Sequence, residues 1–238
     1  MQQIVAMGGG GFSMEPDNLL LDRFIFSLVP HSHPKVLLLP TASGDSADMI
    51  DLFHDCIGRQ LQARTAVLRL TKERYDNLED IMLSADIIYV TGGHTTYMLD
   101  AWKLYGVDRL LRQAWERGTM LAGVSSGSAC WFQEALTDSN PEGLSPEPCL
   151  SLLEGSHCAH YENTGRRPAF HSAIDKGKIM PGYGVENFVG MYFKGTVLQG
   201  AYASREGYNA YKVGPGGHGI EESTIPCTYL GDLLHKNS

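Results

Sequence analysis

Basic residues are scarce in this chain, and long apolar runs are missing. The 238 residues include 19 Lys and Arg against 27 Asp and Glu, which gives a formal net charge of -8. Nucleic acid binding draws on concentrated basic surface, and the sequence contains no basic run. No apolar stretch reaches the ~18 residues that a membrane-spanning helix needs. We therefore expect a protein that binds neither nucleic acid nor membrane.

Paired cysteines are missing too. The chain has five cysteines, an odd number, and none of them forms a C-x-x-C motif. Scattered single cysteines are typical of reduced thiols rather than of a disulfide framework. The first residues show neither a basic segment nor a long apolar segment, so no signal peptide is expected. These features predict a cytoplasmic protein.

The first half of the chain alternates short apolar runs with longer amphipathic stretches. Strand-like runs lie at 3–7, 35–40, 66–70, 87–91 and 119–123, and helical spacing appears at 18–27, 48–60, 77–83 and 95–116. Brief, wholly apolar strands between helices are typical of a parallel sheet that is buried on both faces. The pattern predicts an α/β fold with a doubly wound, mostly parallel sheet in three layers.

The pattern changes after residue 139. Prolines and glycines punctuate a loop at 141–148, and from residue 179 onward turns separate short strand-like runs. We interpret these runs as an antiparallel extension of the same sheet. The whole chain, 1–238, is then expected to form a single domain.

A G-x-S-x-G motif follows the strand-like run at 119–123. In Gly123-x-Ser125-x-Gly127 the small residues allow a sharp turn from strand to helix, which is the context of a nucleophile elbow. Such a turn would hold the Ser125 hydroxyl above the sheet. The alternative is a Gly-Ser turn that only caps a helix.

A serine nucleophile needs a base, and histidines cluster downstream of the motif. His157, His160 and His171 fall within fifteen residues of one another. They could serve catalysis, or each could simply form local hydrogen bonds in a loop. A metal site using Cys158 as well is a further alternative, but the spacing fits no standard zinc signature, so we expect no metal.

Two glycine segments follow predicted strands. Gly92-Gly93 would present backbone N–H groups at the carboxyl edge of the sheet, where they could bind an oxyanion, or they could serve a tight turn only. The glycines at 8–11 do not complete a nucleotide-binding fingerprint. We therefore predict no nucleotide cofactor.

Taken together, these segments resemble the peptidase E family of serine peptidases, which includes cyanophycinase-like enzymes. The resemblance rests on residues 7–13, 40–43, 91–95, 123–127 and the segment around His160, in this order and spacing. It covers most of the chain. It implies a three-layer fold similar to class I glutamine amidotransferases, with serine in place of cysteine at the elbow.

The resemblance also implies roles for individual residues. Ser125 would be the nucleophile and His160 the base, with Asp138 as the acid that orients the histidine. Glu134 and Glu162 are alternative acids, because both lie close to these residues in sequence.

The resemblance further implies that the backbone N–H groups of Gly93 and Ser126 form an oxyanion hole. Here the chain departs from the family pattern, which usually reads G-x-S-A-G, because Ser126 replaces the alanine. The substitution places a second hydroxyl beside the nucleophile.

Substrate contacts can be named only as candidates. Peptidase E prefers short peptides with an N-terminal aspartate, so Arg166 or Arg167 would pair with a substrate carboxylate. His94 and Tyr161 are further candidates for substrate contact. The aromatic residues Tyr97, Trp131, Tyr161 and Phe170 could instead line an apolar pocket or belong to the core.

The sequence thus predicts a serine peptidase that cleaves short peptides through an acyl-enzyme, without cofactor or metal. Two other functions stay open: a cyanophycinase-like isopeptide hydrolase, and an inactive binding protein on the same fold. A homodimer is the default expectation for assembly.

Overall fold

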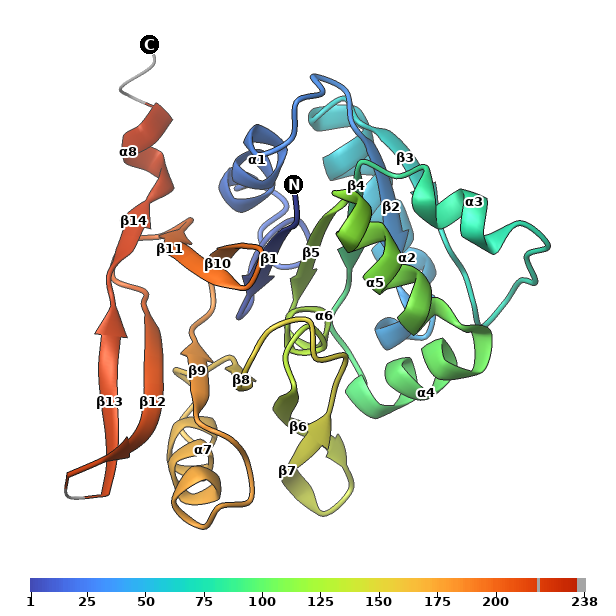
Figure 1. Cartoon of the computed structure of the whole chain (residues 1–238). Helices are drawn as coiled ribbons and strands as arrows, with labels where there is room; N and C mark the ends of the chain where they lie inside the picture. Colours follow the sequence, from blue (N-terminus) through green and yellow to red (C-terminus); the bar gives the residue numbers. More distant parts are fainter. Residues whose placement is uncertain (218, 235–238) are drawn as a thin grey trace.

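The computed structural model describes residues 1–217 and 219–234, and its larger sheet has eight strands (Figure 1). Five of these strands run parallel in the order β1-β5-β4-β2-β3. Their bounds are Gln3–Met7 (β1), Met120–Val124 (β5), Ile87–Val90 (β4), Lys35–Leu39 (β2) and Arg64–Val67 (β3). The predicted α/β fold with a mostly parallel sheet is confirmed.

Three later strands extend this sheet beyond β1. Strand β10 (Val189–Lys194) pairs antiparallel with β1, β11 (Val197–Ala203) pairs antiparallel with β10, and β14 (Cys227–Tyr229) lies parallel to β11. The expected antiparallel extension therefore exists, but it uses only part of the C-terminal half.

The remaining strands form a second, six-stranded sheet in the order β13-β12-β9-β8-β6-β7. Their bounds are Gly219–Ile225 (β13), Ala210–Gly216 (β12), Gly182–Val185 (β9), Ser156–Ala159 (β8), Glu134–Asn140 (β6) and Gly143–Pro148 (β7). The prediction of one continuous sheet is wrong here. Strand β6 starts after the short helix α6 (Ser126–Ala129), which carries the chain away from the first sheet, and β6 then pairs with β7 and β8.

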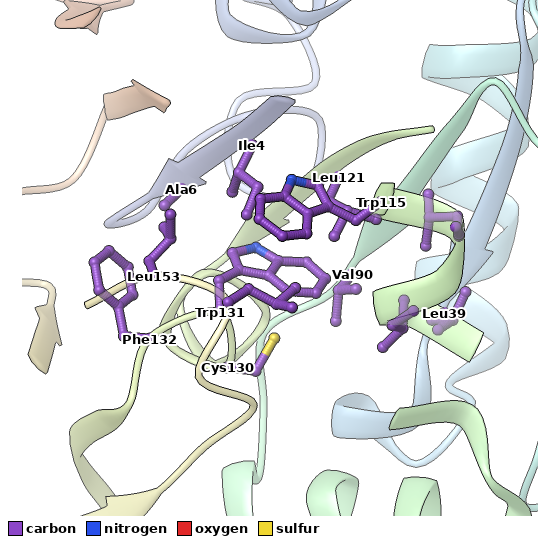
Figure 2. Close-up of a cluster of buried hydrophobic side chains, with 14 of the residues drawn as sticks. Ile4, Ala6, Leu39, Val90, Trp115, Leu121, Cys130, Trp131, Phe132 and Leu153 are labelled. Atoms are coloured by element: carbon purple, nitrogen blue, oxygen red, sulfur yellow. The ribbon is translucent and has the colours of Figure 1, made fainter. Parts of the chain in front are cut away.

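Helices cover both faces of the first sheet, as the alternation of strand residues requires. Val5 and Met7 of β1 pack with α1 (Leu20–Ser27), α2 (Ala47–Phe53) and the π-helical segment His54–Gln60. Ile4 and Ala6 point to the opposite face, where α3 (Leu78–Leu83), α4 (Thr95–Tyr105) and α5 (Val107–Arg117) pack. Figure 2 shows this second face, with Trp115 and Trp131 beside Leu121.

The single helix predicted at 95–116 is two helices, α4 and α5. Gly106 separates them with φ of 73°, a left-handed conformation that glycine adopts without steric cost. The break lets the chain reverse over the sheet, and both helices bury their apolar sides against it.

A smaller core lies beneath the second sheet. Helix α7 (Arg166–Asp175) buries Phe170 and Ile174 against Leu136 and Val213 of the sheet. The last described element is α8 (Leu230–Leu234). Across 1–217 and 219–234, every helix is too short or too polar to pass through a bilayer.

Candidate active site

The elbow after β5 holds Ser125 in a strained turn. Its backbone has φ of 56° and ψ of -117°, which is rare for a residue with a side chain. The flanking glycines are required by space: a Cβ on Gly123 would lie 2.0 Å from the Gly127 carbonyl oxygen, and one on Gly127 would lie 2.3 Å from that of Val90. The motif therefore forms the sharp strand-to-helix turn that its spacing predicts.

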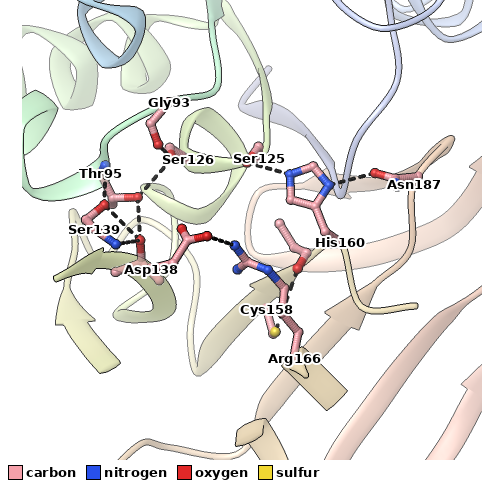
Figure 3. A network of polar contacts seen from close by, with 12 residues as sticks. Gly93, Thr95, Ser125, Ser126, Asp138, Ser139, Cys158, His160, Arg166 and Asn187 are labelled. Atoms are coloured by element: carbon pink, nitrogen blue, oxygen red, sulfur yellow. Dashed lines mark hydrogen bonds and ion pairs between the residues drawn. The ribbon is translucent and has the colours of Figure 1, made fainter. Parts of the chain in front are cut away.

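The Ser125 hydroxyl meets His160, as expected from the sequence. Ser125 Oγ lies 2.8 Å from His160 Nε2 (Figure 3). His160 follows β8 directly and has φ of 52°, so its ring is turned toward the elbow from the second sheet. The two sheets thus meet at this pair of side chains.

The other ring nitrogen of His160 contacts an amide rather than a carboxylate. His160 Nδ1 lies 2.7 Å from Asn187 Oδ1, and Asn187 Nδ2 donates to Glu162 Oε1. Glu162 Oε2 also accepts from the Asn187 backbone N–H at 3.0 Å. An ionised carboxylate only accepts hydrogen bonds, so Glu162 fixes the amide with its oxygen toward His160.

This arrangement selects one tautomer of His160. Because Asn187 Oδ1 can only accept, the proton of the neutral ring sits on Nδ1. Nε2 is then left as the acceptor for the Ser125 hydroxyl, which is the state a general base needs.

Asp138 does not occupy the predicted place beside the histidine. Its side chain is 64% exposed and pairs with Arg166, whose Nη2 lies 2.6 Å from Asp138 Oδ2. Glu134 is also elsewhere, accepting from the Met180 N–H at 2.8 Å. The choice of Asp138 rests on its position between serine and histidine in sequence, whereas in the fold β6 places it beside Arg166 of α7.

Sequence reasoning missed Asn187, although the glycine run at 8–11 held a signal for it. A Cβ on Gly9 would lie 1.9 Å from Asn187 Oδ1, and one on Gly8 would lie 2.3 Å from the Val185 carbonyl oxygen. These glycines therefore make room for the segment after β9 that carries Asn187. Their role is close packing against the site.

The predicted oxyanion donors lie beside the elbow. Gly93 has φ of 141°, and a Cβ there would lie 2.1 Å from the Ala42 carbonyl oxygen, so only glycine fits. A Cβ on Gly92 would lie 3.0 Å from Ser125 Cβ, which places this loop against the nucleophile. Within 1–217 and 219–234, the N–H groups of Gly93 and Ser126 have no hydrogen-bond acceptor.

The second hydroxyl of the elbow is engaged away from His160. Ser126 Oγ donates to the Gly93 carbonyl oxygen at 2.6 Å and accepts from Thr95 Oγ1 at 2.9 Å. Ser126 is buried, and its single proton is held by a carbonyl that cannot act as a general base. Of the two elbow hydroxyls, it is that of Ser125 that lies within hydrogen-bond distance of His160.

Two predicted substrate contacts, Tyr161 and Arg167, are held by Glu222. Tyr161 is fully buried in the smaller core, with its hydroxyl 2.6 Å from Glu222 Oε2 and 2.9 Å from His171 Nε2. Arg167 pairs with the same Glu222 and lies over the Tyr211 ring at 4.8 Å. The assignment of Tyr161 to substrate is therefore wrong, because its side chain is buried. Arg167 is 45% exposed, and its ion pair ties α7 to β13.

Glu222 is the centre of that cluster. Burial opposes its ionisation, but hydrogen bonds from Tyr161, Arg167 and His171 outweigh the burial and lower the pKa of Glu222. The carboxylate therefore stays ionised at neutral pH and holds its three partners.

His94 and His157, two other histidines near the elbow, take different positions. His94 is exposed beside Gly93, and its Nδ1 accepts from the Tyr97 N–H at 3.2 Å to cap α4. Burial lowers the pKa of His157 to about 3, so this ring is neutral under ordinary conditions. In the described part of the chain no three His, Cys, Asp or Glu residues gather in a way that could hold a metal ion.

Comparisons with known proteins identify the family of this chain. Residues 4–199 match the model of peptidase family S51. The chain belongs to peptidase family S51. It is 41% identical over 232 residues to a Bacillus subtilis (strain 168) protein named uncharacterized peptidase YgaJ, a match that covers 97% of this chain and 100% of the relative. An uncharacterized peptidase of Listeria innocua, Lin0382, is 28% identical over 102 residues, which cover 40% of this chain and 49% of the relative.

Solved structures agree on the fold of this S51 member. A crystal structure described as a putative peptidase E protein from Listeria monocytogenes EGD-e has a TM-score of 0.59 at 16% identity, covering 95% of this chain and 100% of that one. A peptidase from an acI-B1 Actinobacterium has a TM-score of 0.63 at 16% identity, covering 94% of this chain and 95% of that one. The fold is that of class I glutamine amidotransferase-like peptidase E proteins. By family, the chain is a serine-type peptidase.

Proposed function

We propose that this S51 peptidase hydrolyses short peptides through an acyl-enzyme on Ser125. The observation that carries the proposal is the 2.8 Å contact between Ser125 Oγ and His160 Nε2, with the tautomer of His160 fixed by Asn187. Asn187 takes the orienting role of the third triad member, and Glu162 acts behind it. Unrelated proteases also pair a histidine with an asparagine, so an amide in this position is compatible with nucleophilic catalysis.

In the proposed reaction, Ser125 Oγ attacks the carbonyl carbon of the scissile peptide while its proton moves to His160 Nε2. The resulting imidazolium keeps its Nδ1–H on Asn187 Oδ1, and the nearby Glu162 carboxylate stabilises its charge. Collapse of the tetrahedral intermediate breaks the C–N bond, and His160 returns the proton to the leaving amine. Water then gives a proton to His160 Nε2 as it attacks the ester, and His160 passes that proton to Ser125 Oγ as the C–O bond breaks and the carboxylic acid leaves.

The developing oxyanion is assigned to the free N–H groups of Gly93 and Ser126. Both lie at the elbow without another acceptor in the described chain, and Ser126 also begins helix α6. A donor that is aimed at the oxyanion before reaction typically contributes ~3 kcal/mol to lowering the barrier.

For the substrate, Arg166 is the better candidate of the arginine pair. The Arg166 side chain is itself less exposed than that of Arg167, 13% against 45%, and the choice rests on their partners. Asp138, the partner of Arg166, is 64% exposed, whereas Glu222, the partner of Arg167, is 12% exposed and held by further hydrogen bonds. A solvated carboxylate is exchanged more easily than a buried one. We therefore propose that a substrate carboxylate competes with Asp138 for Arg166.

Replacing Arg166 by glutamine should raise KM for peptides with an acidic residue by about tenfold or more, while kcat changes little. The reason is that the lost interaction is one of substrate binding, outside the Ser125–His160 pair. Steady-state kinetics on acidic and neutral peptides measure the effect. Arg167→Gln is the matched control, because it removes the neighbouring charge; an equal rise in KM in the control would contradict the assignment.

The test of the proposed function is hydrolysis of a library of dipeptides and short peptides, followed by mass spectrometry. Wild type should release free amino acids, and Ser125→Ala should release none. The library includes β-linked aspartyl peptides, because cleavage of these alone would favour the cyanophycinase-like alternative. If no peptide were cleaved, a binding function on the same fold would replace this proposal.

A further inference from the structure

The elbow residue Ser126 belongs to a network of four hydroxyl groups, three of which are on buried residues. Thr95 Oγ1 lies 2.9 Å from Ser126 Oγ and 3.0 Å from Thr137 Oγ1, and Thr137 Oγ1 lies 3.0 Å from Ser139 Oγ. Thr95, Ser126 and Thr137 are all less than 10% exposed. The network joins the elbow, the start of α4 and strand β6 (Figure 3).

The direction of every proton in this network follows from one end. The Gly93 carbonyl oxygen can only accept, so the Ser126 hydroxyl donates to it. Each hydroxyl has one proton, so Thr95 donates to Ser126, Thr137 to Thr95, and Ser139 to Thr137. Ser139 Oγ in turn accepts from the Thr95 N–H at 2.7 Å.

All four O–H bonds therefore point along one path toward the Gly93 carbonyl. Hydrogen bonds in a unidirectional chain polarise and strengthen one another in a low-dielectric interior. The peptide group between Gly93 and His94 is held at both ends, because the His94 N–H donates to the Ala42 carbonyl oxygen at 2.8 Å. The Gly93 N–H belongs to the preceding peptide group, which is joined to this one at the Gly93 Cα. Fixing the Gly93–His94 peptide therefore restrains the position of the Gly93 N–H.

We propose that Thr137, Thr95 and Ser126 are positioning residues that align the oxyanion loop from Gly92 to His94. This inference rests on the proposed acyl-enzyme mechanism, because it assigns the loop a role in that reaction. It also accounts for Ser126, where the family pattern has alanine, because this hydroxyl is the one that donates to the Gly93 carbonyl oxygen. In this account β6 acts on the reaction through the loop and touches no reacting atom.

Thr137→Val tests the inference, because it keeps the shape of the side chain and removes a hydroxyl from the middle of the hydrogen-bonded network. Thr119→Val is the matched control: Thr119 is also buried and donates to the Ala85 carbonyl oxygen at 3.2 Å, at the amino end of β5. Thr137→Ser restores a hydroxyl and should rescue the effect. Ser126→Ala is the second variant and removes the last link.

Two readouts separate positioning from general destabilisation. Hydrogen–deuterium exchange of the peptide spanning 92–96 should become about tenfold faster in Thr137→Val and Ser126→Ala, but not in Thr119→Val. In the same two variants, kcat should fall about tenfold with KM within about twofold of wild type.

Equal exchange at 92–96 in Thr137→Val and Thr119→Val would overturn the inference. Faster exchange with unchanged kcat would overturn it as well, because the loop would then have no role in the reaction. The exchange readout does not need turnover. A wild-type protein without hydrolytic activity would therefore refute the proposed function, and the exchange data would still decide whether the hydroxyls hold the loop.

Discussion

Replacing Asn187 by alanine is expected to lower kcat/KM by about 10²- to 10³-fold, with the fold retained. The amide oxygen is the acceptor that keeps the proton of His160 on Nδ1, and without it the ring can adopt the tautomer that cannot accept the Ser125 proton. Mutations that favour the wrong tautomer in serine proteases lower catalysis by up to about 10⁴-fold. Initial rates on a cleaved peptide, with circular dichroism as a check of folding, measure the effect.

Two further variants test whether the Asn187 amide orients His160. Glu162→Gln removes the charge that fixes the Asn187 amide, so the amide can rotate and activity should fall. Gly9→Ala should also lower activity, because its Cβ would collide with Asn187 Oδ1. Gly165→Ala is the control for it, since a Cβ there has no atom within 4 Å. Full activity in Asn187→Ala would show that another residue orients His160.

Asp22→Asn should stabilise the fold at high pH but not at low pH. Asp22 is fully buried on α1, and burial raises the pKa of its carboxyl from 3.8 to about 7, although a hydrogen bond from Tyr89 at 3.0 Å opposes the rise. Well below pH 3.8 the group is protonated in both the folded and the unfolded chain. Between pH 4 and 7 only the unfolded chain loses its proton, so the stability of the wild type falls as the pH rises.

The size of this effect follows from the pKa shift. A shift of about three units corresponds to about 4 kcal/mol of stability lost above pH 7. The amide introduced by the substitution cannot ionise, so the difference in unfolding free energy between the variant and wild type should grow by that amount from pH 4 to 8. Urea denaturation at several pH values measures it. Asp100→Asn on the exposed side of α4 is the control, and a pH-independent difference for Asp22→Asn would contradict the account.

Most of the first sheet and its helices could be predicted from the sequence. Apolar runs of five residues specify strands that are buried on both faces, and β1 (Gln3–Met7) has the predicted bounds. The third strand is less well placed: it spans Arg64–Val67, four partly exposed residues at the sheet edge, so its pattern is weaker than that of the apolar run at 66–70. The second sheet was missed because a pattern identifies strands but not their partners.

The site shows the same limit. Ser125 and His160 come from local motifs, and their contact follows from the turn after β5 and the left-handed residue after β8. Asn187 follows a strand of the second sheet, 27 residues beyond His160, and no pattern in its own segment marks it; the glycines that make room for it lie at 8 and 9. Asp138 was chosen by its place in the chain, and only the sheet topology shows that it faces Arg166 instead. The contacts of Asn187 and Asp138 therefore depend on how distant segments pair, which local sequence patterns do not show.

The central claim is that Ser125 is an activated nucleophile, and a fluorophosphonate tests it most directly. The intact masses of wild type, Ser125→Ala and Ser126→Ala are measured after the reagent has been added. The account predicts one adduct on wild type and on Ser126→Ala, and none on Ser125→Ala. An unmodified wild type, or an adduct that is lost in Ser126→Ala and kept in Ser125→Ala, would contradict it.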